Sequence, residues 1–252
     1  MAERVALVTG ASSGIGRAAV VELRRRGLAV LAVARRADRL ERLAAETGAA
    51  FHVGSLDTAE GCAAAVDAAH RRLGPVSVLV NNAAIGSASD ASILDLRREG
   101  WRAIMDLNLD APFELARLCA PDMVEQRWGR VVMVSSTSAT QGEPDSAAYC
   151  ASKAALLGLA RSIAIDLAPH GVTCNAVLPG WVRTEMADRS ARREADATGR
   201  SVEDVWAARA ASYPSGRVVS PEEVAATIGF LASELASGVS GEAVTVAGGA
   251  LS

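Results

Sequence analysis

The sequence predicts an α/β fold in which helices cover both faces of one doubly wound parallel sheet. Short β-branched runs alternate with helical stretches along the chain, as is typical of parallel strands joined by helical crossovers. No linker, repeat or low-complexity tract interrupts this alternation. Half of the 252 residues are hydrophobic and 22% are charged, which excludes a disordered chain or a coiled coil. We therefore expect one domain over residues 1–252.

Each expected element has its own signal in the sequence. Short apolar runs of strand length predict seven strands: Val5–Val8, Ala29–Ala34, Ala50–Val53, Val78–Val80, Arg130–Val134, Thr173–Val177 and Ala243–Val246. Longer stretches between them predict six helices: Gly14–Arg26, Arg39–Thr47, Thr58–Arg72, Leu96–Gln126, Ala148–Ala168 and Pro221–Ala232. Gly27 ends the first helix as its C′ residue, and Ser220 with Pro221 opens the last as N-cap and N1.

The stretch Glu185–Arg217 departs from this rhythm. It is polar and rich in arginine, with only scattered apolar residues. A long irregular insertion in a compact domain is usually functional or mobile. We interpret it as a short helical lid over a substrate site; the alternative is a disordered surface loop.

Charge and cysteine usage restrict the partners and the compartment. The net charge of −3 and the pI near 5.7 argue against a nucleic-acid-binding surface. No uncharged apolar run is long enough to span a membrane, and the first strand leaves no room for a signal peptide. The cysteines show no metal-binding spacing and fit buried thiols in a reducing compartment: Cys62, Cys119, Cys150 and Cys174. We expect a cytoplasmic protein without a metal site.

A glycine-rich turn follows the first strand. It reads Thr9-Gly10-Ala11-Ser12-Ser13-Gly14-Ile15-Gly16 and leads directly into a predicted helix. Glycines at such a turn let backbone N–H groups approach a pyrophosphate at the positive end of the helix. The spacing is TGxxxGxG rather than GxGxxG, and its place between a first strand and a helix predicts a Rossmann-type dinucleotide site.

Further motifs follow in a fixed order. They are Asn81-Asn82-Ala83-Ala84 after a strand, then Asn108, Ser136, Tyr149-Cys150-Ala151-Ser152-Lys153, Pro179-Gly180 and Thr184. Together with the glycine-rich turn, this series resembles the short-chain dehydrogenase/reductase family over the entire chain, with Ala84 in place of a usual glycine. The segment Tyr213–Arg217 before Pro221 resembles the 3-oxoacyl-carrier-protein reductase branch. The resemblance implies hydride transfer with a nicotinamide cofactor.

Tyr149 and Lys153 carry the expected acid–base chemistry. Lys153 is the only lysine in a chain that otherwise uses arginine, and it lies four residues after Tyr149 on one helix face. An adjacent ammonium favours the phenolate, so the phenol can exchange a proton with a substrate oxygen. The alternative is a lysine left by chance on a solvated face.

Family resemblance gives each catalytic residue its role. Tyr149 is the general acid/base, and Lys153 supports it and holds the nicotinamide ribose. Ser136, which lies 13 residues before Tyr149, hydrogen-bonds the substrate oxygen. Asn108 supports the lysine through a water. Taken alone, Ser136 reads as a strand-end cap, and Asn108 as a polar residue inside a helix.

The end of the second strand predicts the cofactor. Ala34 stands where an acidic residue would bind the ribose of NAD, and Arg35 and Arg36 follow. We expect NADP(H) in preference to NAD(H), with Arg35 on the 2′-phosphate; the alternative is a solvated helix start. Whether Ser55 or Asp57 contacts the adenine stays open. The full expected cofactor site is Gly10, Ser12, Ser13, Gly14, Ile15, Gly16, Arg35, Arg36, Leu56, Asp57, Asn82, Ala83, Tyr149, Lys153, Pro179, Gly180 and Thr184.

Residues at the carboxyl ends of the strands and in the expected lid predict a mainly apolar substrate pocket. Its expected walls are Ser138, Gln141, Pro144, Trp181, Met186, Trp206 and Tyr213. They favour a small neutral ketone or secondary alcohol; which compound, with which stereochemistry, stays open. A carrier-bound thioester is the alternative, with Arg127 and Arg130 as docking residues. A non-catalytic nucleotide sensor is a third reading. We also expect a homotetramer formed through the two long helices, with no nucleic acid or membrane partner.

Overall fold

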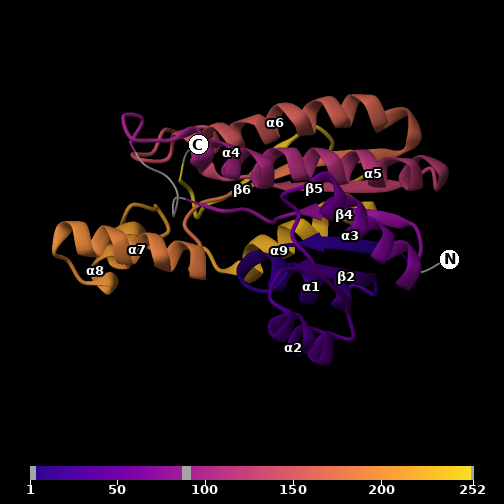
Figure 1. The fold of residues 1–252 in the computed structure, drawn as a ribbon, viewed down its shortest axis with the longest axis horizontal. Coiled ribbons are helices and arrows are strands. Elements are labelled where there is room, and N and C mark those ends of the chain that lie inside the picture. The colour runs from indigo at the N-terminus through magenta and orange to yellow at the C-terminus, as the bar shows by residue number, and fades with distance from the viewer. Residues whose placement is uncertain (1–3, 87–91, 251–252) are drawn as a thin grey trace.

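A computed structural model describes residues 4–86 and 92–250. Within these ranges seven parallel strands form one sheet in the order β3-β2-β1-β4-β5-β6-β7 (Figure 1). The strands are β1 (Val5–Thr9), β2 (Ala29–Ala34), β3 (Ala50–Val53), β4 (Val76–Asn81), β5 (Gly129–Val134), β6 (Val172–Pro179) and β7 (Ala243–Val246). The order reverses between β1 and β4, which confirms the doubly wound α/β fold.

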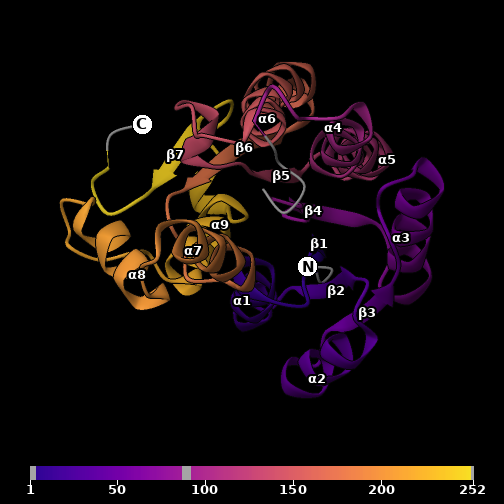
Figure 2. The same ribbon diagram turned by 60° about the vertical axis from the view of Figure 1, so that its left-hand side comes forward.

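The helices lie between the strands in sequence and on the two faces of the sheet in space (Figure 2). They are α1 (Gly14–Arg25), α2 (Ala37–Thr47), α3 (Ala59–Arg72), α4 (Arg98–Met105), α5 (Ala111–Glu125), α6 (Ala147–Leu167), α7 (Glu185–Thr198), α8 (Val202–Ala211) and α9 (Pro221–Leu231). Helices α3, α5 and α6 contribute to one core cluster, and α1, α2 and α9 to the other.

The buried strands alternate between these two clusters. In β1, Leu7 packs in the first cluster, whereas Ala6 and Val8 pack in the second. Successive side chains of a strand point to opposite faces, and both faces here are covered by helices. This double burial explains why the strands are continuous apolar runs rather than alternating apolar and polar residues.

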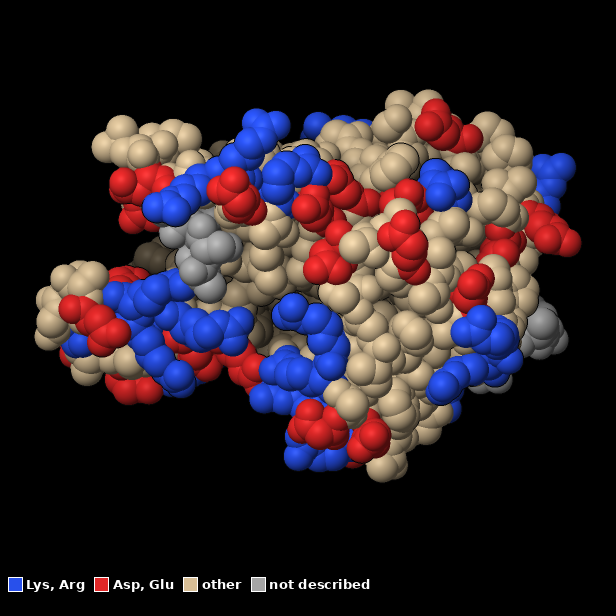
Figure 3. All heavy atoms as spheres, viewed as in Figure 1, with Lys and Arg blue, Asp and Glu red and all other residues tan. Residues whose placement is uncertain are grey.

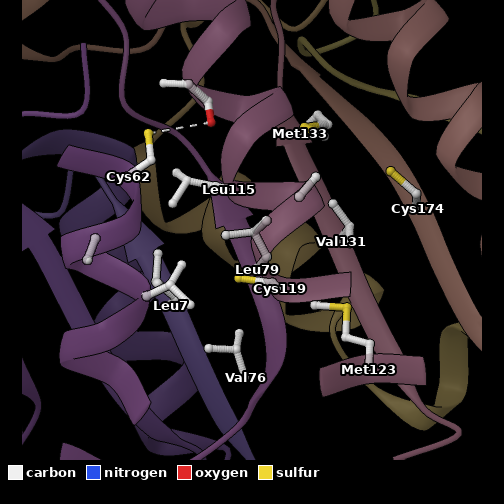
Figure 4. Packing of buried hydrophobic residues seen from close by; sticks show 14 of the residues in the cluster. Leu7, Cys62, Val76, Leu79, Leu115, Cys119, Met123, Val131, Met133 and Cys174 are labelled. Atoms are coloured by element: carbon white, nitrogen blue, oxygen red, sulfur yellow. Dashed lines mark hydrogen bonds between the residues drawn. The ribbon is translucent and has the colours of Figure 1, made fainter. Parts of the chain in front are cut away.

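Sulfur atoms fill part of the first cluster, next to Leu7, Leu79 and Leu115 (Figure 4). Cys62, Cys119 and Cys174 are buried free thiols, as expected, whereas Cys150 is only half-buried. Burial raises the pKa of Cys62 to about 11 and that of Cys174 to about 12, because the thiolate loses its hydration. These two thiols therefore stay protonated and act as small apolar groups.

The predicted helix Leu96–Gln126 is interrupted in its hydrogen bonding. Helix α4 passes into a π-helical turn, Asp106–Asp110, before α5 begins. A π turn widens the helix by one residue and is frequent at functional sites. This turn contains Asn108, which is buried.

The stretch 185–217 contains two helices, α7 and α8, which lie at one end of the molecule (Figure 1). They have a small core of their own, made by Ala191, Ala195, Val205 and Trp206. Arg209 stacks on Trp181, with its guanidinium 3.6 Å from the ring centroid, and donates to Glu194 at 2.9 Å. The helical prediction for this segment is confirmed, and the alternative of a disordered loop is wrong.

Helix α6 and its 3-10 extension, Ala147–His170, have the length and apolar composition of a membrane span. The core helix of a folded domain passes the same test. Here α6 packs on β6 and contributes Leu156, Leu157 and Ala160 to the first core cluster. We therefore interpret it as a core helix.

Candidate active site

The glycine-rich turn is pressed against the end of β4. A Cβ on Gly16 would lie 2.4 Å from the Gly10 carbonyl oxygen and 2.5 Å from Asn82 Nδ2. Gly10 itself has φ +66°, a conformation that favours glycine. Asn82 Nδ2 donates to the Thr9 carbonyl at 2.8 Å and so joins the two strand ends. A side chain at either glycine would collide with Asn82 at the end of β4, so the turn is a cradle of bare backbone.

The helix behind this cradle is suited to an anion. Ser13 is the N-cap of α1 in extended conformation, and its side chain makes no capping hydrogen bond. The first-turn amides and the helix dipole of α1 therefore point toward the cradle without a side-chain cap. This arrangement fits the pyrophosphate of a dinucleotide.

Arg36, rather than Arg35, reaches the glycine-rich turn. Its Nη2 donates to Ser13 Oγ at 2.7 Å and to Ser12 Oγ at 2.8 Å. Arg35 is exposed. Arg36 is the N-cap of α2 and has an extended backbone. Of the two expected phosphate-binding arginines, Arg36 thus contacts the turn, and Arg35 lies exposed beside it.

Two further charged residues complete this corner. Arg36 Nη1 donates to Glu185 Oε2 at 2.7 Å, and Arg39 forms an ion pair with the other oxygen of Glu185. Arg39 follows Arg36 by one helical turn, a spacing visible in the sequence. Nothing in the sequence pointed to Glu185, which lies 149 residues from Arg36.

The surface of the molecule is hollowed beside the α7–α8 end (Figure 3). Basic side chains gather on both sides of the hollow between the α7–α8 end and the rest of the molecule (Figure 3). Acidic side chains lie among them. The surface thus offers paired charges rather than one continuous basic patch.

The remaining expected cofactor residues line the same edge of the sheet. Thr184 is the N-cap of α7, and its Cγ2 lies 3.0 Å from a Cβ built on Gly14. Gly180 follows β6, and a Cβ there would meet the Tyr213 hydroxyl at 2.3 Å. Leu56 packs in the first core cluster, so its side chain is structural. Ser55 and Asp57 are both exposed, and the adenine contact stays open between them.

Lys153 is buried beneath Tyr149 on α6. Its Nζ donates to the Val134 carbonyl at 2.8 Å and lies 5.6 Å from the centroid of the Tyr149 ring. Only 3% of Lys153 is exposed, whereas Tyr149 is half-buried. Burial lowers the pKa of Lys153 to about 8, because a desolvated ammonium is disfavoured. The structure therefore rules out a lysine on a solvated face.

Ser136 begins a short chain of hydroxyl contacts. Its Oγ accepts from the Ser138 amide at 3.1 Å and donates to Ser138 Oγ at 3.0 Å. Ser138 Oγ in turn donates to Glu143 Oε1 at 2.7 Å. Ser136 thus caps the 3-10 turn Thr137–Ala139, in agreement with its position at a strand end. Its hydroxyl proton is donated to Ser138 Oγ. Glu143 carried no recognisable signal in the sequence.

Asn108 clamps the loop after β4. Its Oδ1 accepts from the Ile85 amide and its Nδ2 donates to the Ile85 carbonyl, both at 2.9 Å. Nδ2 also lies 3.2 Å from Ser152 Oγ, one residue before Lys153. The π turn directs this side chain to both the loop and α6, and Asn108 joins them.

Three expected wall residues instead hold the α7–α8 end together. Trp181 and Trp206 pack edge to face at 6.4 Å, with the Arg209 guanidinium on both rings. The Tyr213 hydroxyl accepts from the Trp181 amide. Met186 is placed differently, since its Sδ lies 2.9 Å from a Cβ built on Gly86, in the loop after β4. Met186 therefore lies against the loop after β4.

Comparison with known proteins decides the family. A family model described as enoyl-(acyl carrier protein) reductase, of the short-chain dehydrogenase type, matches residues 10–250. The chain belongs to the short-chain dehydrogenase/reductase family. It is 39% identical over 253 residues to a Streptomyces virginiae protein described as a ketoacyl reductase of the monensin polyketide synthase, covering 98% of this chain and 96% of the relative.

Other members of the short-chain dehydrogenase/reductase family agree with this assignment. The 3-oxoacyl-[acyl-carrier-protein] reductase FabG of Rickettsia prowazekii is 32% identical, covering 98% of this chain and 97% of its own. A variant of actinorhodin polyketide ketoreductase, solved with NADPH, superposes with a TM-score of 0.93 at 34% identity, covering 98% of each chain. L-sorbose reductase from Gluconobacter frateurii, complexed with NADPH and L-sorbose, gives 0.91 at 30%, covering 99% of this chain and 97% of its own.

The chain is thus a nicotinamide-dependent oxidoreductase of the ketoreductase type. Among the residues that the structure describes, no group of three His, Cys, Asp or Glu side chains could hold a metal ion. At the carboxyl edge of the sheet, the fold brings Tyr149 and Lys153 together, with Lys153 Nζ 5.6 Å from the centroid of the Tyr149 ring.

Proposed function

We propose that this enzyme is an NADPH-dependent carbonyl reductase that acts on a small, mainly apolar ketone or the corresponding secondary alcohol. The observation that carries the proposal is the buried Lys153 ammonium beneath the half-exposed ring of Tyr149. A desolvated charge at this place stabilises a phenolate and orients a proton donor toward the carboxyl edge of the sheet.

Tyr149, Ser136 and Lys153 have different roles in the reduction of the substrate carbonyl. NADPH, when bound, supplies the hydride to the carbonyl carbon. Tyr149 gives its phenolic proton to the oxygen as negative charge develops there. Ser136 donates a hydrogen bond to the same oxygen once its hydroxyl turns away from Ser138. Lys153 stays fixed by the Val134 carbonyl and stabilises the phenolate that remains.

The preference for NADP(H) over NAD(H) rests on Arg36. Its guanidinium lies on Ser12 and Ser13, beside the turn that fits the pyrophosphate, and no carboxylate occupies the end of β2. A guanidinium binds a phosphate in a bidentate manner. The actinorhodin ketoreductase and the L-sorbose reductase were solved with NADPH, which supports the same preference here.

Reduction of a carrier-bound 3-oxoacyl thioester is the second candidate, because the FabG relatives share 32% identity with the chain. The expected docking residues do not support it. Arg130 is only 2% exposed and bonds the carbonyls of Gly129, Gly171 and Ser233. Arg127 precedes β5, at the amino edge of the sheet, whereas the site lies at the carboxyl edge. The free ketone therefore remains our first choice.

The test is oxidation of NADPH and NADH, in parallel, with a panel of aliphatic and aryl ketones and a 3-oxoacyl thioester. Turnover of a ketone with NADPH that disappears in Tyr149→Phe supports the proposal. Turnover of the thioester alone would replace it with the second candidate. Nucleotide binding without turnover of any substrate would indicate a nucleotide sensor instead.

The wider organisation follows from the same features. We propose one catalytic domain with α7 and α8 as its lid, because Thr184, the N-cap of α7, lies beside the glycine-rich turn. The buried free thiols support a cytoplasmic location. Exposed apolar side chains on α5 and α6 support a homotetramer.

A further inference from the structure

Glu185 joins the expected lid to the nucleotide corner. It is the first residue of α7, and its two carboxylate oxygens bind Arg36 and Arg39 at the start of α2. Hydrogen bonds from Arg36 and then Arg39 hold the pKa of Glu185 below its usual range. At neutral pH the corner therefore contains one carboxylate between two guanidiniums.

The same two guanidiniums suit a phosphate. Arg36 presents Nη2 to the hydroxyls of the glycine-rich turn and Nη1 to Glu185, so its donors are shared between the turn and the carboxylate. Phosphate monoesters carry more charge than a carboxylate and accept bidentate contacts from arginine. Glu185 thus occupies donors that the 2′-phosphate of NADP(H) would use.

The ion pairs of Glu185 with Arg36 and Arg39 are weak enough for a phosphate to displace the carboxylate. The side chains of Arg36, Arg39 and Glu185 are 39%, 34% and 41% exposed. Ion pairs at this exposure are weakened by water, and each contributes little. A phosphate dianion can therefore replace the Glu185 carboxylate on the two arginines. A nucleotide with a free 2′-hydroxyl has no charged group at that position and does not compete with Glu185.

We propose that Glu185 is a specificity-determining residue that competes with the 2′-phosphate of NADP(H) for Arg36 and Arg39. The proposal rests on the proposed function, since it requires that Arg36 face the 2′-phosphate. Glu185 lowers the affinity of the enzyme for the nucleotide with a 2′-phosphate and leaves its affinity for the nucleotide without one unchanged. By reciprocity, the bound phosphate releases the first turn of α7 from α2.

The experiment is isothermal titration calorimetry with two nucleotides that differ only at the 2′ position. Adenosine 2′,5′-bisphosphate carries the phosphate and 5′-AMP lacks it; neither has a nicotinamide, so no turnover is involved. We expect Glu185→Gln to bind the bisphosphate roughly three- to ten-fold more tightly than the parent enzyme. Binding of 5′-AMP should not change.

The matched control is Glu46→Gln. Glu46 forms an ion pair with Arg17 whose side chains are 52% and 46% exposed, so the same charge is removed from a similar setting. It should leave both affinities unchanged. Glu185→Ala, as a second variant, should shift the bisphosphate affinity in the same direction as Glu185→Gln.

The outcomes distinguish a failure of the proposed NADP(H) preference from a failure of the proposed role of Glu185. If the parent enzyme binds both nucleotides equally, the proposed NADP(H) preference fails. If it prefers the bisphosphate but Glu185→Gln binds this ligand no more tightly, the competitor role of Glu185 is overturned. Equal gains for both nucleotides would also overturn it, because they would reflect a general effect of charge.

Discussion

At the scale of single residues, the buried Lys153 explains why an arginine-rich chain keeps one lysine. Its ammonium fits under the Tyr149 ring and donates to one carbonyl, that of Val134. A guanidinium is larger, planar and permanently charged, and would need several acceptors at the same place. The site therefore requires the compact, tunable cation.

The lowered pKa of Lys153 predicts a pH dependence of stability. Between pH of about 8 and 10.5 the folded protein holds this lysine largely neutral, whereas the unfolded chain keeps it charged. The unfolded state then binds more protons, so the free energy of unfolding rises with pH. The titration of Lys153 raises the free energy of unfolding by at most about 3 kcal/mol over this pH range.

Urea denaturation at pH 8 and pH 10 measures this contribution. The parent enzyme should gain stability relative to Lys153→Met between the two pH values. The buried thiols oppose the rise, since their pKa values are raised, but they are present in both proteins and cancel. Equal pH slopes for the two proteins would contradict the prediction.

Two adjacent arginines give a second residue-scale prediction. Arg36→Gln should raise the KM for NADPH about ten-fold, the equivalent of about 1.4 kcal/mol for a charged hydrogen bond, and leave the KM for NADH unchanged. Arg35→Gln is the control, because Arg35 is exposed. Steady-state kinetics with both cofactors decides; a larger effect at Arg35 would restore the assignment suggested by the sequence.

At the scale of elements, the turn between β1 and α1 keeps its shape because the ends of β1 and β4 meet there. The turn has no space for a side chain at Gly16, and Asn82 from the end of β4 holds its backbone. The π turn between α4 and α5 performs a comparable task on the other side, where Asn108 fixes the loop after β4.

Gly16→Ala tests the turn. The added methyl would lie 2.4 Å from a backbone oxygen, so the turn must open. We expect at least ten-fold weaker nucleotide binding and a loss of about 1–3 kcal/mol in stability. Gly238→Ala is the control, since its Cβ would meet nothing within 4 Å. Fluorescence titration with NADPH and thermal unfolding measure both effects; unchanged binding by Gly16→Ala would show that the cradle tolerates a side chain.

At the scale of the whole molecule, the strand order gathers the site from distant segments. The turn after β1, the loop after β4, the hydroxyls after β5 and the start of α7 after β6 all lie at the carboxyl edge of one sheet. Helices α5 and α6 cover the face beside it and leave Phe113 48% and Ile165 75% exposed. These are the side chains that the proposed homotetramer would cover.

Association through this face predicts a mass of about 104 kDa, four times 25.9 kDa. Ile165→Glu places a charge in the expected interface and should shift the enzyme to smaller species in light scattering coupled to gel filtration. Val21→Glu, on α1, adds the same charge at another exposed apolar position and should leave the mass unchanged. A parent enzyme that runs as a monomer would refute the homotetramer.

The sequence by itself determined the features that depend on short spacing. Apolar periodicity set the strands and helices, glycine spacing set the turn, and a four-residue interval placed Tyr149 and Lys153 on one face of α6. Each depends on backbone geometry within a few residues, which local sequence controls. This is why the fold and the proximity of Tyr149 to Lys153 could be predicted.

Only the tertiary structure decided which charged side chains meet. It placed Arg36 rather than Arg35 on the turn, brought Glu185 to Arg36 across 149 residues, and packed Trp181 and Trp206 against Arg209. Such contacts depend on how the helices pack on the sheet and on which rotamers that packing permits. No spacing along the chain encodes them, because they form only when distant elements come together.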